Sequence, residues 1–238
     1  MSPIIELSPL ASRGRHVLST HEQIVRALAA DILTGRFAPG DKLPLEAELL
    51  ERFGVSRTAL REGFLSVKTR VGTRVTDPVH WNYFDKEVLT WKVSGGMDAA
   101  FHRQLAEVRR AVEPAAAGLA AERRTDQDLA VMRSAIAAMR AEERSEYAFA
   151  QADLALHLAV GAASQNPMMR SLASVIETAL LEVFTLSPPT RNLRLHGETV
   201  DAHERIVDCI EARDSQGAAN AMLAVINAGF NRVEAERP

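Results

Sequence analysis

The sequence contains a single cysteine, Cys209, among its 238 residues, and only 5% of the residues are aromatic. One cysteine cannot form a disulfide within the chain, so nothing indicates an oxidising compartment. No apolar run approaches the roughly 20 residues that span a bilayer, and the N-terminus lacks the regions of a signal peptide. These absences argue against a secreted or membrane protein, and we expect a cytoplasmic location.

The net charge of −3 at pH 7 does not by itself indicate a nucleic-acid-binding protein. The charge is unevenly distributed, however: residues 1–76 contain 11 Lys and Arg against 8 Asp and Glu, and the remainder contains 17 against 23. A small basic module before a larger acidic one is consistent with a DNA-binding domain followed by a sensing domain. A difference of this size also arises by chance, so it carries little weight alone.

Strand-like alternation of apolar and polar residues is confined to residues 69–76. Apolar positions at helical spacing predict helices over about 98–123, 126–143, 145–163, 167–186, 192–212 and 215–235. We expect Pro114 to kink the first of these helices. Thr125 and Asp128 predict a capping box at the start of the second. The pattern is that of a mainly α protein.

The most informative segment lies between Gly35 and Arg61. It contains a turn, a short helix, a tight turn at Gly54 and a second helix that Ser56 caps. This order is typical of a helix-turn-helix, whose second helix enters the major groove of DNA. We predict that the second helix continues to about Val67.

The first turns of this second helix carry two hydroxyl side chains and two arginines. A guanidinium can fork onto O6 and N7 of guanine, and Ser or Thr can hold a phosphate. Arginines four residues apart are otherwise typical of a solvent-exposed helix face. The turns that precede them favour DNA binding by Ser56, Arg57, Thr58 and Arg61.

The segment GRFAPGDKLPLEAELLERFGVSRTALREGF resembles the winged helix-turn-helix of the GntR superfamily. The helical remainder resembles the FCD-type effector domain of its FadR branch, and the segment WNYFDKEVLTW resembles that of regulators that respond to sugar acids such as D-galactonate. The resemblance implies a transcriptional regulator of a catabolic operon rather than an enzyme. It further implies a homodimer that binds palindromic operator DNA and a small carboxylate effector, for which an aldonate is the best candidate.

The residue pattern and the resemblance together divide the chain into four segments. The expected segments are a mobile arm at 1–19, a winged helix-turn-helix domain at 20–77, a linker helix at 78–97, and an all-α antiparallel bundle for effector binding and dimerisation at 98–238. The wing would add DNA contacts from Arg70, Thr73 and Arg74.

Two departures from the family pattern affect the expected DNA contacts. Ala47 stands where relatives often have an arginine. Roughly eight residues fewer than in relatives follow Val67, and we expect nothing there to supply the first strand of the wing. Either a mobile wing tip is missing from the sequence, or the protein has lost part of its wing and binds DNA poorly.

Three polar residues of the helical region are candidate ligands for a divalent transition metal such as zinc. Asp153 and His157 lie four residues apart on one face of a predicted helix, and His203 precedes the apolar face of another. An Asp and two histidines that face a bundle interior suit such a metal. Alternatively, Asp153 and His157 merely pair with each other. Metal-binding relatives use a fourth ligand, a histidine, where this chain has Val225.

With three protein ligands, water or effector oxygens would complete the metal site, or the site no longer holds metal tightly. Spacing alone predicts that Arg109 and Glu113 form an exposed ion pair. The family resemblance instead implies that the arginine faces the effector cavity, where it can bind a carboxylate. His196 faces either the same cavity or solvent. The candidate effector-binding residues are Arg109, Glu113, Asp153, His157, His203 and Asn227.

Two other functions are open at this point. A metal-dependent enzyme that acts on small organic acids could use the Asp and two His with an open coordination position. The sequence shows no separate general base for it, and an attached helix-turn-helix serves no purpose in such an enzyme. A sensor module whose shortened wing impairs DNA binding is the other alternative.

Overall fold

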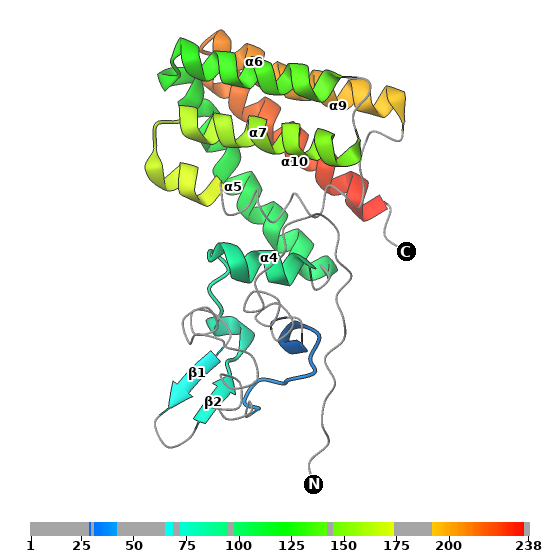
Figure 1. Ribbon diagram of the computed structural model, residues 1–238. Helices are drawn as coiled ribbons and strands as arrows, with labels where there is room; N and C mark the ends of the chain where they lie inside the picture. The colour runs from blue at the N-terminus through cyan, green and yellow to red at the C-terminus, as the bar shows by residue number, and fades with distance from the viewer. Residues whose placement is uncertain are drawn as a thin grey trace. The chain divides into compact units, whose positions relative to one another are not determined.

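The computed structural model describes residues 29, 31–41, 65–68, 72–94, 98–141, 145–173 and 192–235. The chain separates into two compact units, residues 1–96 and 97–238 (Figure 1). In the described residues, no helix is both long and apolar enough to cross a membrane.

The first unit contains an antiparallel hairpin of β1 (Leu65–Lys68) and β2 (Gly72–Val75). Leu65 pairs with Val75, and Lys68 pairs with Gly72. The expectation that this sequence supplies no first wing strand is therefore wrong, and so is the continuation of the second helix to Val67. The four residues LSVK are compatible with a strand, although they are too few to stand out as a strand pattern in the sequence. A short connection is enough to turn β1 into β2.

A turn at residues 38–41 extends the pairing of β2. The backbone N–H of Gly40 donates to the carbonyl of Val75 at 2.9 Å, and the N–H of Val75 donates to the carbonyl of Asp41 at 3.2 Å. Gly40 has a φ of 90°, a conformation that favours glycine. The proline-glycine turn expected from the sequence is thus held against the hairpin.

The segment after the hairpin contains a 3-10 turn, η1 (Pro78–His80), and helix α4 (Lys86–Ser94). The side chain of Asp77 caps η1 by accepting from the N–H of Val79. The indole N–H of Trp81 donates to the carbonyl and the hydroxyl of Thr76, at 3.2 and 3.1 Å. The expected linker helix is therefore divided into two shorter elements.

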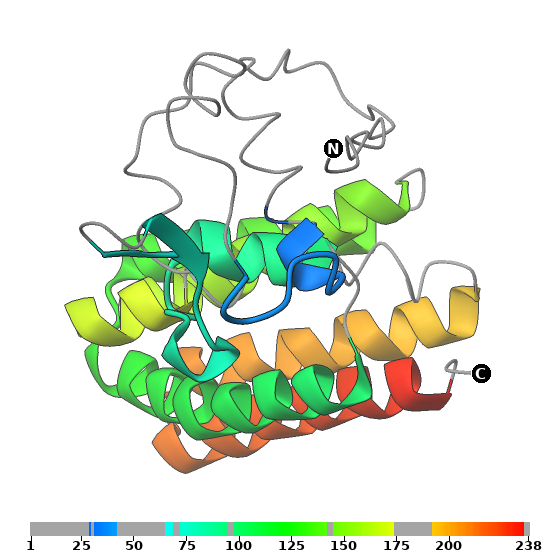
Figure 2. The same cartoon turned by 90° about the horizontal axis from the view of Figure 1, so that it is seen from below.

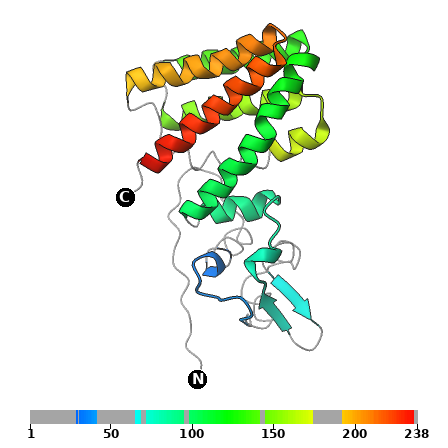
Figure 3. The ribbon, with the colours of Figure 1, turned by 180° about the vertical axis from the view of Figure 1, so that it is seen from behind.

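The second unit is an all-helical bundle, which confirms the mainly α fold class. Its helices are α5 (Ala99–Arg123), α6 (Asp126–Arg140), α7 (Glu146–Ala163), α9 (Leu193–Glu211) and α10 (Ser215–Ala235). Each begins and ends within three residues of the range expected from apolar spacing. Helix α10 packs against both α5 and α9 (Figures 2 and 3).

Local signals fix several of the helix ends. The capping box of Thr125 and Asp128 is confirmed: each side chain accepts from the other residue's backbone N–H. Asp98, Ser145 and Asn192 cap α5, α7 and α9 in the same general way. Helix α5 continues on both sides of Pro114, and the kink expected there stays a prediction.

The core lies between the helices of this unit. Fully buried side chains come from α6, α7, α9 and α10, and include Met132, Leu156, Ile206, Met222 and Ile226. Helix α5 contributes mainly alanines to the core, and small side chains allow neighbouring helices to approach closely. This packing fixes the helix faces on which the polar residues of the next section lie.

Candidate metal and effector site

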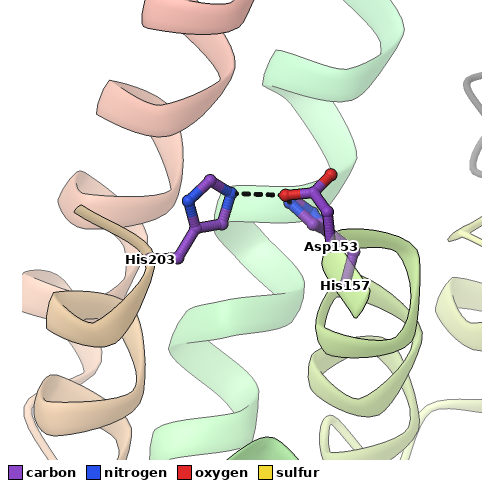
Figure 4. A group of neighbouring side chains, drawn as sticks. All are labelled: Asp153, His157 and His203. Atoms are coloured by element: carbon purple, nitrogen blue, oxygen red, sulfur yellow. Dashed lines mark ion pairs between the residues drawn. The ribbon is translucent and has the colours of Figure 1, made fainter. Parts of the chain in front are cut away.

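Asp153, His157 and His203 converge inside the bundle, as Figure 4 shows. Asp153 and His157 lie one turn apart on α7, and His203 comes from α9. One ligand atom from each residue lies within 4.8 Å of the other two, and all three side chains are buried. The structure therefore brings the three predicted metal ligands together.

The Nδ1 atoms of both histidines are engaged away from the centre of this group. Nδ1 of His203 lies 2.7 Å from the backbone carbonyl of Thr199, and Nδ1 of His157 lies 2.7 Å from Oε2 of Glu113. A carbonyl and an ionised carboxylate can only accept, so each Nδ1 carries the proton. In the neutral rings Nε2 is then the atom with the free lone pair, as in histidines that bind metal.

Two features at Asp153 fit a bound cation. Nε2 of His203 lies 2.8 Å from Oδ1 of Asp153, and two lone pairs at that distance need a proton or a cation between them. Oδ2 of Asp153 is buried and accepts no hydrogen bond from the residues that the structure describes, which is costly without a partner. One carboxylate and two imidazoles are a suitable ligand set for zinc or a similar ion.

The two buried carboxylates stay ionised. Burial alone would raise the pKa of Asp153, but His203, with His157 and Arg109, lowers it to about 2. Burial likewise opposes ionisation of Glu113, whereas the charge of Arg109 and the hydrogen bond from His157 bring its pKa to about 2. The negative charge around the imidazoles favours a cation at this site.

Arg109 and Glu113 form a buried ion pair on α5 rather than an exposed one. Nε of Arg109 lies 2.6 Å from Oε1 of Glu113, and Nη2 lies 3.3 Å from Oε2. Because Oε2 also accepts from His157, Glu113 connects the guanidinium to the imidazole. Glu113 thereby fixes the orientation of both side chains.

A cavity of about 240 Å³ opens beside this group. Four of the predicted effector-binding residues, Arg109, Asp153, His157 and His203, line it, and Val225 does so as well without offering a ligand atom. Glu113 lies behind the wall through its bonds to Arg109 and His157. The other lining residues are Phe149, Leu195, Glu198, Thr199, Ala202, Ala228, Gly229 and Arg232.

Two residues considered for this cavity lie elsewhere. Asn227 was expected to contact the effector, but it does not line the cavity; its side-chain oxygen accepts from Nε of Arg110 at 2.8 Å. The guanidinium of Arg110 lies over the ring of Phe230, 4.8 Å from its centroid. Nε2 of His196 is 2.9 Å from the carbonyl of Met139, so this histidine has a partner outside the cavity.

Most of the predicted DNA contacts fall outside the described residues, namely Ser56, Arg57, Thr58, Arg61 and Arg70, as does Ala47. Thr73 lies in β2, opposite Val67. Arg74 also lies in β2, and its guanidinium donates to the carbonyl of Gly40. DNA binding by these residues stays a prediction.

Comparison with known families gives two matches along the chain. The model described as "FCD domain" matches residues 104–228, and the model described as "Bacterial regulatory proteins, gntR family" matches residues 20–75. The chain belongs to the gntR family. The three candidate metal ligands lie within the FCD match, as do the residues that line the cavity except Gly229 and Arg232.

Individual relatives agree with this assignment. The gntR-family chain is 34% identical over 227 residues to the galactonate operon transcriptional repressor of Escherichia coli K12, covering 91% of the chain and 98% of the relative. It is 33% identical over 204 residues to the HTH-type transcriptional regulator LutR of Bacillus subtilis 168, covering 81% and 91%. These relatives are transcriptional regulators, so the protein is a regulator of the GntR/FCD type and not an enzyme.

A solved structure shares the fold. The structure of Lar, described as controlling the expression of the Listeria monocytogenes agr system, superposes with a TM-score of 0.61 and 17% identity. The match covers 95% of this chain and all of the other. At that identity the likeness supports the fold alone.

Proposed function

We propose that this regulator binds a palindromic operator as a homodimer and responds to a small sugar acid, such as an aldonate, bound with a divalent metal in the FCD cavity. The observation that carries the proposal is the buried Asp153, His157 and His203 group, which shares a wall of the cavity with Arg109.

The chemistry of this wall favours a hydroxy acid. Asp153, His157 and His203 would hold the metal, and Val225 leaves coordination positions for oxygens of the effector. When bound, the metal would attract the carboxylate and the neighbouring hydroxyl of an aldonate. The guanidinium of Arg109 adds a second group that prefers carboxylates.

The size of the cavity agrees with a ligand of this kind. Its volume of about 240 Å³ is below the range of pockets that hold drug-sized molecules, which begins at roughly 300 Å³. The name of the Escherichia coli relative, a galactonate operon repressor, is further support for a sugar acid.

The proposed regulation is thermodynamic linkage between two sites. A homodimer places two recognition helices on the half-sites of a palindrome, one helical turn of DNA or a multiple of it apart. An effector that binds one arrangement of the dimer more tightly than the other shifts the population between them. Operator affinity then changes in the direction of that shift.

A thermal-shift assay on the full chain tests the cavity. Protein treated with a chelator is compared with protein given zinc, gluconate or galactonate, alone and in combination. A ligand at about 100 times its dissociation constant stabilises the folded state by about 2.7 kcal/mol, so a clear rise in the melting temperature is expected with zinc plus acid. An unchanged melting temperature in every mixture would contradict the proposal.

A gel-shift assay tests the DNA half of the proposal. The probe is the region upstream of the protein's own gene, and the salt concentration is held fixed because phosphate contacts make the affinity salt-dependent. We expect a specific shift that the acid alters. Acid binding without any shift would instead favour the sensor module with impaired DNA binding.

A further inference from the structure

Gly229 forms part of the cavity wall on helix α10. The residues of α10 that line the cavity are Val225, Ala228, Gly229 and Arg232, and this helical spacing places them on one face of the helix. Because glycine has no side chain, the backbone of α10 itself is the wall at this position.

Neither the backbone conformation nor the packing of the described residues explains glycine at this position. Positive φ angles occur among the described glycines only at Gly35 and Gly40, and Gly229 lies in regular helix. A Cβ at Gly229 would meet no atom of the described residues within 4 Å. At Gly118 and Gly161, by contrast, a Cβ would lie 3.1 Å from a neighbouring side chain, so close packing favours glycine there. Glycine is less favourable than alanine inside a helix, so the open space in front of Gly229 points to another use.

The position of Gly229 along the cavity follows from the course of the helices. Only residues 212–214 separate α9 from α10, and the two helices lie side by side, so they run antiparallel (Figure 3). His203 and Val225 each lie about ten residues from this connection and are therefore at a similar level. Gly229 lies one turn beyond Val225, about 6 Å along α10. It is thus about one turn away from the metal-ligating end of the cavity.

The distance to Gly229 sets the length of ligand that can reach it. An acid held at the metal-ligating end by its carboxylate and 2-hydroxyl can extend its carbon chain by at most about 1.5 Å per C–C bond. A three-carbon hydroxy acid such as lactate ends within about 3 Å of its carboxyl carbon, whereas a hexonate extends up to about 7 Å. Only the longer chain reaches the level of Gly229.

We propose that Gly229 is a specificity-determining residue: it leaves room for the carbon chain of a five- or six-carbon polyhydroxy acid to pass over the backbone of α10. The chemical class of the effector is the extended aldonates, in preference to three-carbon hydroxy acids. This inference rests on the proposed function, because the carboxylate of the acid occupies the metal-ligating end. A side chain at position 229 would project into the space that the longer chain needs.

Isothermal titration of the zinc-loaded full chain with gluconate, galactonate and lactate tests the inference. Gly229→Ala is expected to weaken both hexonates about tenfold, and Gly229→Val more strongly, because forcing atoms into an occupied space usually costs at least this much. Lactate should keep its affinity for the native protein within about threefold. The zinc affinity of the acid-free protein should stay within about twofold, because neither alanine nor valine offers a metal ligand.

Gly197 provides the matched control. It is half-buried inside α9, and a Cβ there would also meet no atom of the described residues within 4 Å. It does not line the cavity, since it is turned about 200° away from Thr199 on the same helix. Gly197→Ala and Gly197→Val should bind the hexonates as the native protein does. Both alanine variants should raise the melting temperature of the ligand-free protein, so weaker binding by Gly229→Ala would not reflect unfolding.

Three outcomes would overturn the inference. Hexonate affinities of both Gly229 variants within about threefold of those of the Gly197 variants would refute it and leave the proposed function intact. An equal loss of lactate and hexonate binding would refute the dependence on chain length. No binding of any acid by the native protein would refute the inference and the proposed function together.

Discussion

Glu113 on α5 accepts a hydrogen bond from Nδ1 of His157 on α7 at 2.7 Å, with both side chains buried. The same carboxylate pairs with Arg109, so one acidic residue orients two groups of the cavity wall. A carboxylate behind a histidine fixes its tautomer and raises its basicity toward a metal. The binding properties of the cavity therefore depend on a residue that does not line it.

We expect Glu113→Gln to weaken zinc binding by about 10- to 100-fold, because the amide keeps the shape of the side chain but loses its charge. Competition with a chromogenic chelator measures the affinity. Glu107→Gln, an exposed glutamate on the same helix, is the control. Equal zinc affinity in the two variants would show that Glu113 acts only in packing.

Asp153→Asn should abolish the stabilisation by zinc without lowering the melting temperature of the metal-free protein appreciably. The asparagine amide can donate a hydrogen bond to Nε2 of His203. In the native protein, Oδ1 of Asp153 faces the lone pair on Nε2 of His203, which is unfavourable unless a proton or a cation lies between the two atoms. Thermal denaturation with and without zinc measures both effects. Asp201→Asn, exposed on α9, should keep the full response to zinc; a zinc response in Asp153→Asn equal to the control's would exclude Asp153 as a ligand.

Local sequence signals predicted the helices of the second unit and its capping box, because spacing and caps act over only a few residues. The strand β1 was missed, since a four-residue segment that follows a predicted helix is easily assigned to that helix. Nonlocal pairing with β2 decides its conformation.

The errors in predicting which residues line the cavity have a geometric cause. Asn227 is two residues from Val225, which on a helix turns it about 200° away, so nearness in sequence was misleading. Arg232, seven residues from Val225, returns to almost the same face and was overlooked. Which face lines a cavity depends on how α5, α7, α9 and α10 pack, and a single sequence does not specify this.

Val225→His should restore a fourth protein ligand and tighten zinc binding by about tenfold or more. The position lies in the cavity wall beside the Asp and two His, and its side chain is only 8% exposed. Val225→Ala is the control, because it removes the valine side chain without adding a ligand. If the histidine variant binds zinc no better than the alanine variant, Val225 does not face the metal ligands.

Two glycine substitutions should change stability in opposite directions, although each adds one methyl group to a helix. A Cβ on Gly217, in the first turn of α10, would overlap Oδ2 of Asp214 and would lie 3.1 Å from Sγ of Cys209. The clash displaces the Asp214 side chain, which accepts from the N–H of Gly217 at 2.8 Å and satisfies the helix start.

Gly217→Ala is therefore expected to lower the free energy of unfolding by about 1 kcal/mol or more, the usual effect of losing such a cap. A Cβ on Gly197, inside α9, meets nothing within 4 Å. Gly197→Ala should raise the free energy of unfolding by roughly 0.5–1 kcal/mol, because alanine loses less backbone entropy in a helix. Urea denaturation of both variants measures the difference, and a stabilised Gly217→Ala would mean that Asp214 is not held at the helix start.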